Sequence, residues 1–109
     1  MFNLIYAELL NADGIVDKVV CSSMDEFISY RKRGYTGTRA HDQSADAAIA
    51  AECTRFFEPS GLPNRSPFWF LARLRDGSYK MACVIKSNLG GYTVGGVKYA
   101  DIQEWAKVV

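Results

Sequence analysis

Histidine and cysteine, the side chains that dominate metal sites and nucleophilic catalysis, are scarce in this sequence. Its 109 residues contain one histidine and three cysteines. Cys21, Cys53 and Cys83 lie far apart, so neither a CxxC pair nor any other paired ligand spacing is present. An odd number of cysteines cannot close into a full set of disulfides, which indicates reduced thiols in an intracellular, cytoplasmic protein. We expect no metal and no cofactor.

Long apolar runs and a strong charge imbalance are also absent. No apolar stretch approaches the roughly 18 residues of a membrane span, and Glu8 interrupts an apolar N-terminal segment that has no basic residue before it. We therefore expect neither a signal peptide nor contact with a membrane. Thirteen Lys and Arg against twelve Asp and Glu give a formal net charge of +1. This balance excludes an acidic disordered tail and a strongly basic protein that coats nucleic acid.

The sequence offers no arrangement typical of a catalytic site. A reactive thiol needs an adjacent base or cation, and the single histidine, His41, is in a polar segment beside Asp42. Each cysteine is explained more simply as a small buried residue, since free cysteine is among the most buried residue types. The glycine-rich segment 90–98 lacks the spacing of a phosphate-binding loop. We expect no catalytic residues and no enzyme activity.

A β-hairpin and two helices are predicted in the N-terminal half. Apolar runs at residues 2–10 and 15–21 flank Asp13-Gly14, a dipeptide typical of tight hairpin turns. Ser23 and Glu26 then form a capping box, in which the Ser hydroxyl caps the first turn and the Glu side chain returns to the Ser amide.

The first helix should end at Gly34, because glycine readily adopts the left-handed conformation that terminates helices. Residues 34–43 have no apolar period and are interpreted as a loop. An alanine-rich segment predicts a second helix from about Ser44 to Phe57.

The C-terminal third predicts a second hairpin, a short strand and a last helix. Residues 68–75 and 78–86 flank a two-residue turn at Asp76-Gly77, a register that places Leu74 opposite Tyr79 and Phe68 opposite Ile85. Phe70 and Met81 would then share an apolar core face, with Arg73 and Lys80 opposite each other on a solvated face. A strand at 92–97 and a helix from about Tyr99 complete the chain.

These elements predict one α+β domain over residues 1–109. Their order is ββααβββα, and the expected architecture is a mainly antiparallel sheet of about five strands with the helices packed on one face. No internal repeat or low-complexity segment is present.

Two basic surfaces are candidate binding sites. Residues 30–40 carry four cations and no acid, interleaved with tyrosines and glycines, a composition suited to an anionic partner. The candidate contacts there are Arg31, Arg33, Tyr35 and Arg39. The second candidate is the predicted solvated face of the 68–86 hairpin, with Trp69, Arg73, Arg75 and Lys80. Simpler explanations exist for both: cations offset the dipole at a helix C-terminus, and exposed Lys and Arg are commonly just solvated.

The sequence therefore leads to two hypotheses about function. The first is a small non-enzymatic interaction protein, an adaptor or an inhibitor, which binds a protein partner through a basic and aromatic patch. The alternative is a nucleic-acid-binding domain that uses the 30–39 loop and the outer face of the 68–86 hairpin. Salt dependence separates them, because a domain that neutralises several phosphates loses affinity steeply as salt rises.

Overall fold

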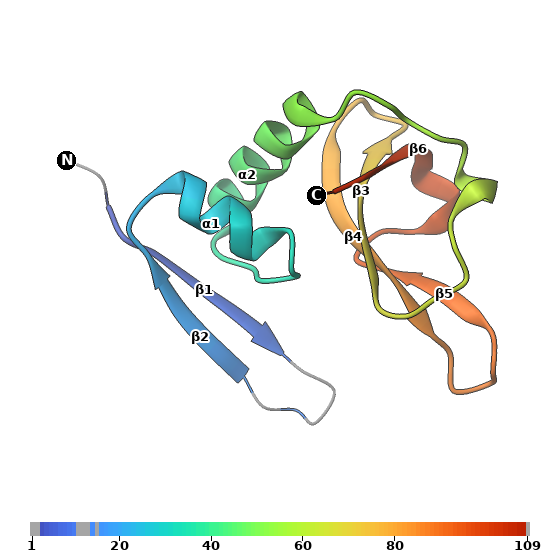
Figure 1. Ribbon diagram of the computed structural model, residues 1–109, viewed down its shortest axis with the longest axis horizontal. Coiled ribbons are helices and arrows are strands. Elements are labelled where there is room, and N and C mark those ends of the chain that lie inside the picture. Colours follow the sequence, from blue (N-terminus) through green and yellow to red (C-terminus); the bar gives the residue numbers. More distant parts are fainter. Residues whose placement is uncertain (1–2, 11–13, 15, 109) are drawn as a thin grey trace.

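The described part of the chain folds into two helices and two antiparallel β-sheets, as a computed structural model shows (Figure 1). The structure describes residues 3–10, 14 and 16–108. In chain order the elements are β1 (Ile5–Leu10), β2 (Val16–Cys21), α1 (Met24–Arg31), α2 (Arg39–Glu52), β3 (Phe68–Leu74), β4 (Tyr79–Lys86), β5 (Tyr92–Gly95) and β6 (Ile102–Lys107), with single 3-10 turns at Pro59–Gly61 and Tyr99–Asp101. One sheet pairs β1 with β2, and the other has the order β5-β4-β3-β6. The α+β class is confirmed.

The helix α1 begins and ends where the sequence predicts. The Ser23 hydroxyl accepts a hydrogen bond from the amide of Glu26 at 3.1 Å. The Glu26 carboxylate accepts from the amide and hydroxyl of Ser22, one residue before the predicted donor. At the other end Gly34 has a φ of 100°, and the amide of Tyr35 donates to the Tyr30 carbonyl, as in a Schellman ending.

The prediction for α2 was wrong at both ends, because the helix spans Arg39–Glu52. Thr38 caps it by accepting a hydrogen bond from the His41 amide at 3.2 Å, so the first helical turn lies inside the segment interpreted as a loop. The helix stops early because the chain becomes extended at Cys53, which brings Phe57 alongside β6.

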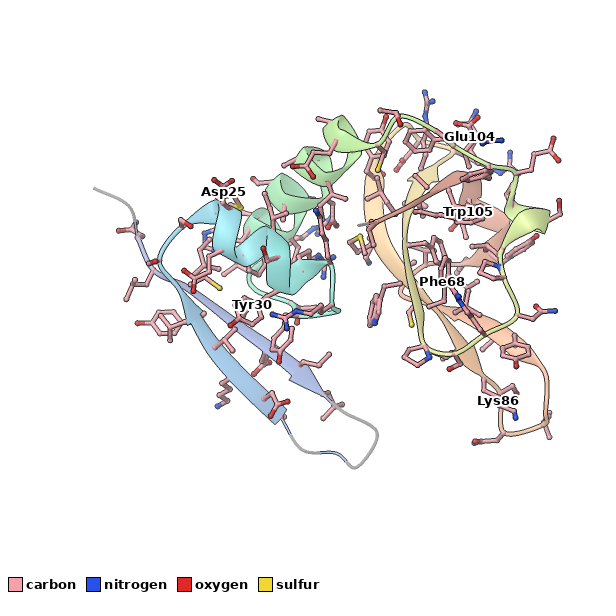
Figure 2. All side chains as sticks on the ribbon, viewed as in Figure 1. Asp25, Tyr30, Phe68, Lys86, Glu104 and Trp105 are labelled. Atoms are coloured by element: carbon pink, nitrogen blue, oxygen red, sulfur yellow. The ribbon has the colours of Figure 1, made fainter. Side chains whose placement is uncertain are left out.

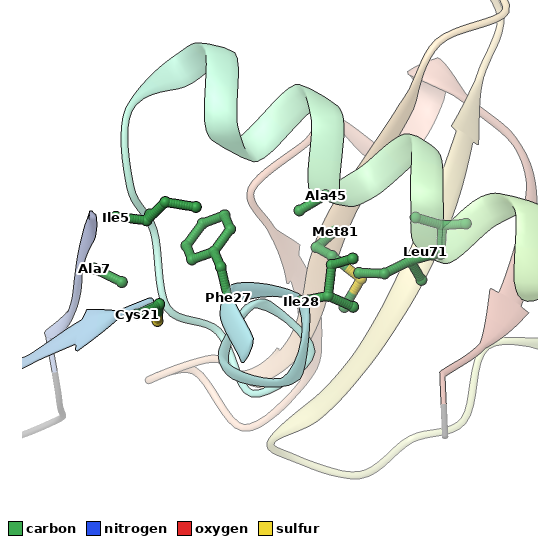
Figure 3. Close-up of a cluster of buried hydrophobic side chains, with 9 residues drawn as sticks. Ile5, Ala7, Cys21, Phe27, Ile28, Ala45, Leu71 and Met81 are labelled. Atoms are coloured by element: carbon green, nitrogen blue, oxygen red, sulfur yellow. The ribbon is translucent and has the colours of Figure 1, made fainter. Parts of the chain in front are cut away.

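The predicted first hairpin is present, with Ile5 opposite Cys21 and Ala7 opposite Val19. Its predicted turn, Asp13-Gly14, lies mostly outside the described residues, although Gly14 itself has a φ of 77°. The inner face of this hairpin packs on Phe27 of α1 (Figure 3). The neighbouring Ile28 packs on the other side of α1, against the larger sheet.

The register of the second hairpin differs from the prediction by one residue, with Phe68 opposite Val84 and Arg73 opposite Tyr79. The turn is a three-residue loop, Arg75–Gly77, in which the Gly77 amide donates to the Leu74 carbonyl and Gly77 has a φ of 88°. An Asp-Gly pair suits this type I turn with a left-handed glycine as well as the two-residue turn. The longer loop shifts every pairing.

Because of this shift, the side chains are distributed over the two sheet faces differently. Phe70 and Met81 are both buried, but on opposite faces. Lys80 lies opposite Ala72, so Arg73 and Lys80 do not face each other. Both faces of the sheet are covered. One packs on the helices, and the other packs on the segment that includes Phe57 and Leu62.

The last element is a strand, not a helix. β6 pairs with β3, and an irregularity between Arg73 and Leu74 leaves one extra residue in β6. This bulge interrupts the alternation, so Ile102 and Trp105 share a face at a spacing of three, which imitates a helical stripe. Trp105 also exchanges two backbone hydrogen bonds with Phe57, at 2.7 and 3.0 Å.

Candidate functional site

Arg31, the first predicted contact residue, is buried rather than displayed to a partner. It is 4% exposed and lies at the end of α1, where Nε and Nη2 donate to the two carboxylate oxygens of Asp46 at 2.8 and 3.0 Å. Its Nη1 donates to the Tyr35 carbonyl at 3.2 Å. The guanidinium therefore ties α1, α2 and the loop between them together. The prediction that Arg31 is presented to a partner is corrected.

Arg33 and Tyr35 are accessible and rest on the ring of Tyr30, which lies at the end of α1 (Figure 2). The Arg33 guanidinium lies 4.5 Å from the ring centroid. Tyr35 meets the same ring edge-on at 5.1 Å, and it is half-buried. This contact accompanies the helix ending described above, so the sequence Tyr-Arg-Lys-Arg-Gly-Tyr builds a firm platform rather than a flexible loop.

Arg39 is the first residue of α2 and is exposed. Free amide groups and the helix dipole give this end of a helix a partial positive charge. A cation here adds to that charge instead of offsetting it. Within the part of the chain that the structure describes, no acidic side chain forms an ion pair with Arg39.

The second predicted surface is divided among different parts of the fold. The Trp69 ring packs over Gly34 on the helix-covered face, and a Cβ at Gly34 would lie 2.3 Å from it. Arg73 pairs with Glu104 at 3.4 Å, and Arg75 donates to a backbone carbonyl in the turn before β6. Lys80 projects from the sheet face opposite the helices, and it forms no ion pair among the described residues. The prediction of one solvated face that holds all four residues was wrong.

One cleft unites members of the two predicted surfaces. It has a volume of about 580 Å³ and is lined by residues from the start of α2, among them Arg39, and from the β3–β4 turn and the start of β4, among them Lys80. We call it the basic cleft after these two cations, although Arg31 and three carboxylates line it as well. Its lining residues are Arg31, Gly37, Arg39, Asp42, Gln43, Asp46, Leu74, Asp76, Ser78, Tyr79 and Lys80.

The acidic residues of the basic cleft accept hydrogen bonds within the protein, whereas two of its cations, Arg39 and Lys80, form no ion pair among the described residues. Asp46 is bound by Arg31, and Asp42 accepts a hydrogen bond from the Gly37 amide at 2.8 Å. Asp76 accepts from the amide and hydroxyl of Ser78, and these bonds hold the pKa of its carboxyl below the usual range. The cleft therefore offers Arg39 and Lys80 to an incoming carboxylate.

The histidine and the cysteines are placed as structural residues. His41 packs edge-on against Phe27 with ring centroids 6.3 Å apart. Burial raises the pKa of each thiol, Cys21, Cys53 and Cys83, which favours the protonated and unreactive form at neutral pH. Among the described residues, no group of three or more His, Cys, Asp and Glu side chains is placed to hold a metal ion.

Exposed apolar side chains also mark surfaces that the sequence reasoning missed. Tyr6 is 70% exposed and Val20 51% exposed on the outer face of the β1–β2 hairpin, where they lie opposite each other. Tyr92 and Tyr99 are about half exposed near β5. In β1, alternation gives the signal: if Ile5 and Ala7 face the core, Tyr6 must face outward.

No helix in the described part of the chain is long and apolar enough to cross a membrane. Comparison with protein-family models, with curated proteins and with solved structures found no match to this chain. What the protein does must therefore be inferred from its own residues and their arrangement.

Proposed function

We propose that this protein is a binding module of adaptor or inhibitor type, and that it recognises acidic side chains of a protein partner in the basic cleft. The observation that carries the proposal is the state of the charges there. Arg39 and Lys80 line the cleft and form no ion pair among the described residues, while Asp42, Asp46 and Asp76 accept hydrogen bonds from within the protein.

The position of Arg39 supports a role outside the fold. A cation at a helix N-terminus is unfavourable by about 0.3–1 kcal/mol, because it meets the positive end of the dipole. A carboxylate of a partner would reverse this effect, since it could bond to the guanidinium and also interact favourably with the helix end. Lys80, which also lines the cleft, would hold a second acidic group, so two acids on the partner would fix its orientation.

The loop that forms part of the cleft is pre-organised for binding. Arg31 holds the carbonyl of Tyr35, and Asp42 holds the amide of Gly37, so the backbone before α2 is fixed at two points. Thr36 is further joined to β1 by two hydrogen bonds of 2.9 Å with Glu8. A fixed loop loses little conformational entropy when a partner binds, which favours affinity.

The same geometry favours a protein over a nucleic acid. Base stacking would need an exposed aromatic platform beside the cations, but Trp69 is covered by the end of α1. Asp42 and Asp76 line the cleft with Arg39 and Lys80, and their negative charges oppose a row of several phosphates more strongly than one or two carboxylates. The nucleic-acid alternative therefore has less support than the protein partner.

The test is an affinity capture from cell extract with three baits, followed by titration of purified partner. The baits are the wild type, Arg39→Glu/Lys80→Glu, and the control Arg55→Glu/Lys107→Glu. The control reverses two exposed cations around Phe57, beyond the opposite end of α2, which is about 21 Å long. Circular dichroism and melting must show that all three are folded.

We expect a protein that is captured by the wild type and the control but lost from the Arg39→Glu/Lys80→Glu bait. In titrations with purified partner, the cleft variant should bind at least tenfold more weakly, about 1.4 kcal/mol. Raising the salt concentration should weaken partner binding by the wild type and the control more than binding by the cleft variant. A partner that binds the cleft variant with wild-type affinity would refute the proposal. Capture of a nucleic acid in place of a protein would also refute it.

A further inference from the structure

Of the four sheet edges in the described chain, three are protected against pairing with a further strand, in different ways. The outer edge of β5 is not protected. The outer edge of β1 is bonded to Thr36, and that of β6 to Phe57. β2 carries the exposed charges Asp17 and Lys18, which discourage pairing with another strand. β5 has the sequence Tyr-Thr-Val-Gly, without charge or proline, and no strand lies on its outer side in the described chain.

The hydrogen-bond pattern shows which backbone groups β5 exposes. In the turn before β5, the Ser87 amide donates to the Gly91 carbonyl at 2.7 Å, so these residues form a hydrogen-bonded pair. Bonding alternates along an antiparallel ladder. Thr93 and Gly95 therefore bond to β4, whereas the backbone groups of Tyr92 and Val94 point outward from the sheet.

A groove lies over β4 and β5, on the sheet face that packs on Leu62. Its volume is about 270 Å³, and one side is formed by Val84, Tyr92, Thr93 and Val94 of β4 and β5. The other side is the proline-containing segment after α2, and Tyr99 closes the lining. The remaining lining residues are Pro59, Ser60, Leu62, Pro63 and Asn64. The tyrosines, 43% and 52% exposed, supply the large rigid contact surface that interfaces favour.

We propose that an extended segment of a partner protein docks next to this groove as an added strand on β5. Its backbone would bond to the outward groups of Tyr92 and Val94. Every second side chain would point toward the groove, where apolar side chains would contact Val84, Leu62 and Pro63. This site is separate from the basic cleft, with which it shares no lining residue.

The charges around the groove define the docked segment further. Lys86 lies opposite Tyr92 at the tip of the β4–β5 hairpin (Figure 2), and Lys98 directly precedes Tyr99. Both lysines are exposed, and neither forms an ion pair with an acid among the residues described. The segment should therefore carry an acidic residue near each end of its apolar part.

These lysines also argue against a second copy of this chain as the occupant. Antiparallel pairing of β5 with its own copy would bring Lys98 of one chain toward Lys86 of the other at both ends of a strand of only four residues. Like charges at both ends of so short a strand disfavour its pairing with a second copy. A segment with acidic ends instead gains from the same two positions.

The probe is a phage-displayed library of random nine-residue peptides selected on the whole protein, followed by titration with the enriched peptide after synthesis. We expect enriched peptides with alternating apolar residues and acidic ends, which shift the amide resonances of residues 92–95. The decisive variant is Val94→Pro, which removes one outward amide while leaving the bonds to β4 intact, because proline is tolerated on an edge strand. Val94→Ala is the control that loses the side chain but keeps the amide.

Val94→Pro should melt like Val94→Ala and bind the peptide at least tenfold more weakly than that control. Four results would overturn the proposal: no enriched sequence, equal binding by the two variants, shifts confined to Arg39 and Lys80, or a wild-type dimer in light scattering that Val94→Pro dissolves. Shifts at Arg39 and Lys80 would still support the basic cleft. If no partner binds the basic cleft of the wild type while the peptide still binds β5, only the proposed function is refuted.

Discussion

Replacing Arg31 by alanine should destabilise the fold, although the residue belongs to a run of cations that looks like a binding loop. Arg31 and Asp46 are 4% and 2% exposed, and the guanidinium makes two hydrogen bonds to the carboxylate and one to the Tyr35 carbonyl. Alanine at 31 would leave Asp46 buried between the helices without its charge partner. It would also leave the Tyr35 carbonyl without its donor.

The size of the effect follows from the cost of an uncompensated buried charge. Removing one partner of a buried ion pair costs about 3–5 kcal/mol. With a urea slope of about 1.5 kcal/mol per molar, the unfolding midpoint should fall by about 2–3 M. This is a large part of the 5–15 kcal/mol that typically separates folded and unfolded domains.

The assay is urea unfolding followed by circular dichroism, with three variants that separate charge from packing. Arg31→Ala and Asp46→Ala should each lose several kcal/mol, whereas Arg31→Met combined with Asp46→Leu should retain near-wild-type stability. Arg39→Ala, an exposed residue in the same run, should not destabilise the fold and should stabilise it by at most about 1 kcal/mol, because it removes an unfavourable charge at the helix N-terminus. An Arg31→Ala midpoint equal to that of the wild type would refute the reasoning.

Three further predictions concern the core and the thiols. Gly34→Ala should cost about 2–4 kcal/mol in urea unfolding, because its φ of 100° disfavours a side chain and the new Cβ would lie 2.3 Å from the Trp69 ring; a stable variant would contradict that contact. Phe70→Ala should cost about 3–5 kcal/mol, against less than 1 kcal/mol for the half-exposed Arg73→Ala, and a reversed order would show that the register is wrong. Cys83 should react slowly with a thiol reagent at neutral pH and faster as the pH rises through its raised pKa, because only the thiolate reacts; rapid labelling of the folded protein at pH 7 would disprove its burial.

Features set by residues close in sequence were predictable. The Ser23 cap that starts α1 and the glycine that ends it act within a few residues, and both were placed correctly. The same holds for the existence of the two predicted hairpins. The Asp76-Gly77 pair signals a turn, but it does not determine whether the loop has two residues or three. Because the loop has one residue more than predicted, Arg73 lies on the helix-covered face and Lys80 on the other.

Features set by distant residues were not predictable in the same way. Ile102 and Trp105 have helical spacing only because a bulge in β6 breaks the strand alternation, and the bulge exists through pairing with β3. Phe57 leaves the predicted helix because its backbone bonds to Trp105, 48 positions further along. Helix propensity in the alanine-rich segment is a weak preference that such pairing overrides.

The positions of Arg31 and Arg39 show how a count of charged residues in a segment can be refined. Arg31 follows Phe27 by four residues, so both lie on one face of α1, and Asp46 precedes Ile49 by three residues on the buried stripe of α2. Opposite charges at buried positions of two neighbouring helices are the sequence signal of an internal ion pair. Arg39 precedes Asp46 by seven residues and so lies on the same side of α2, but it is the first residue of the helix, before the buried stripe, and is exposed. Sorting cations by helix face and by their place along the helix therefore separates buried from exposed cations, and it directs the search for function to the basic cleft.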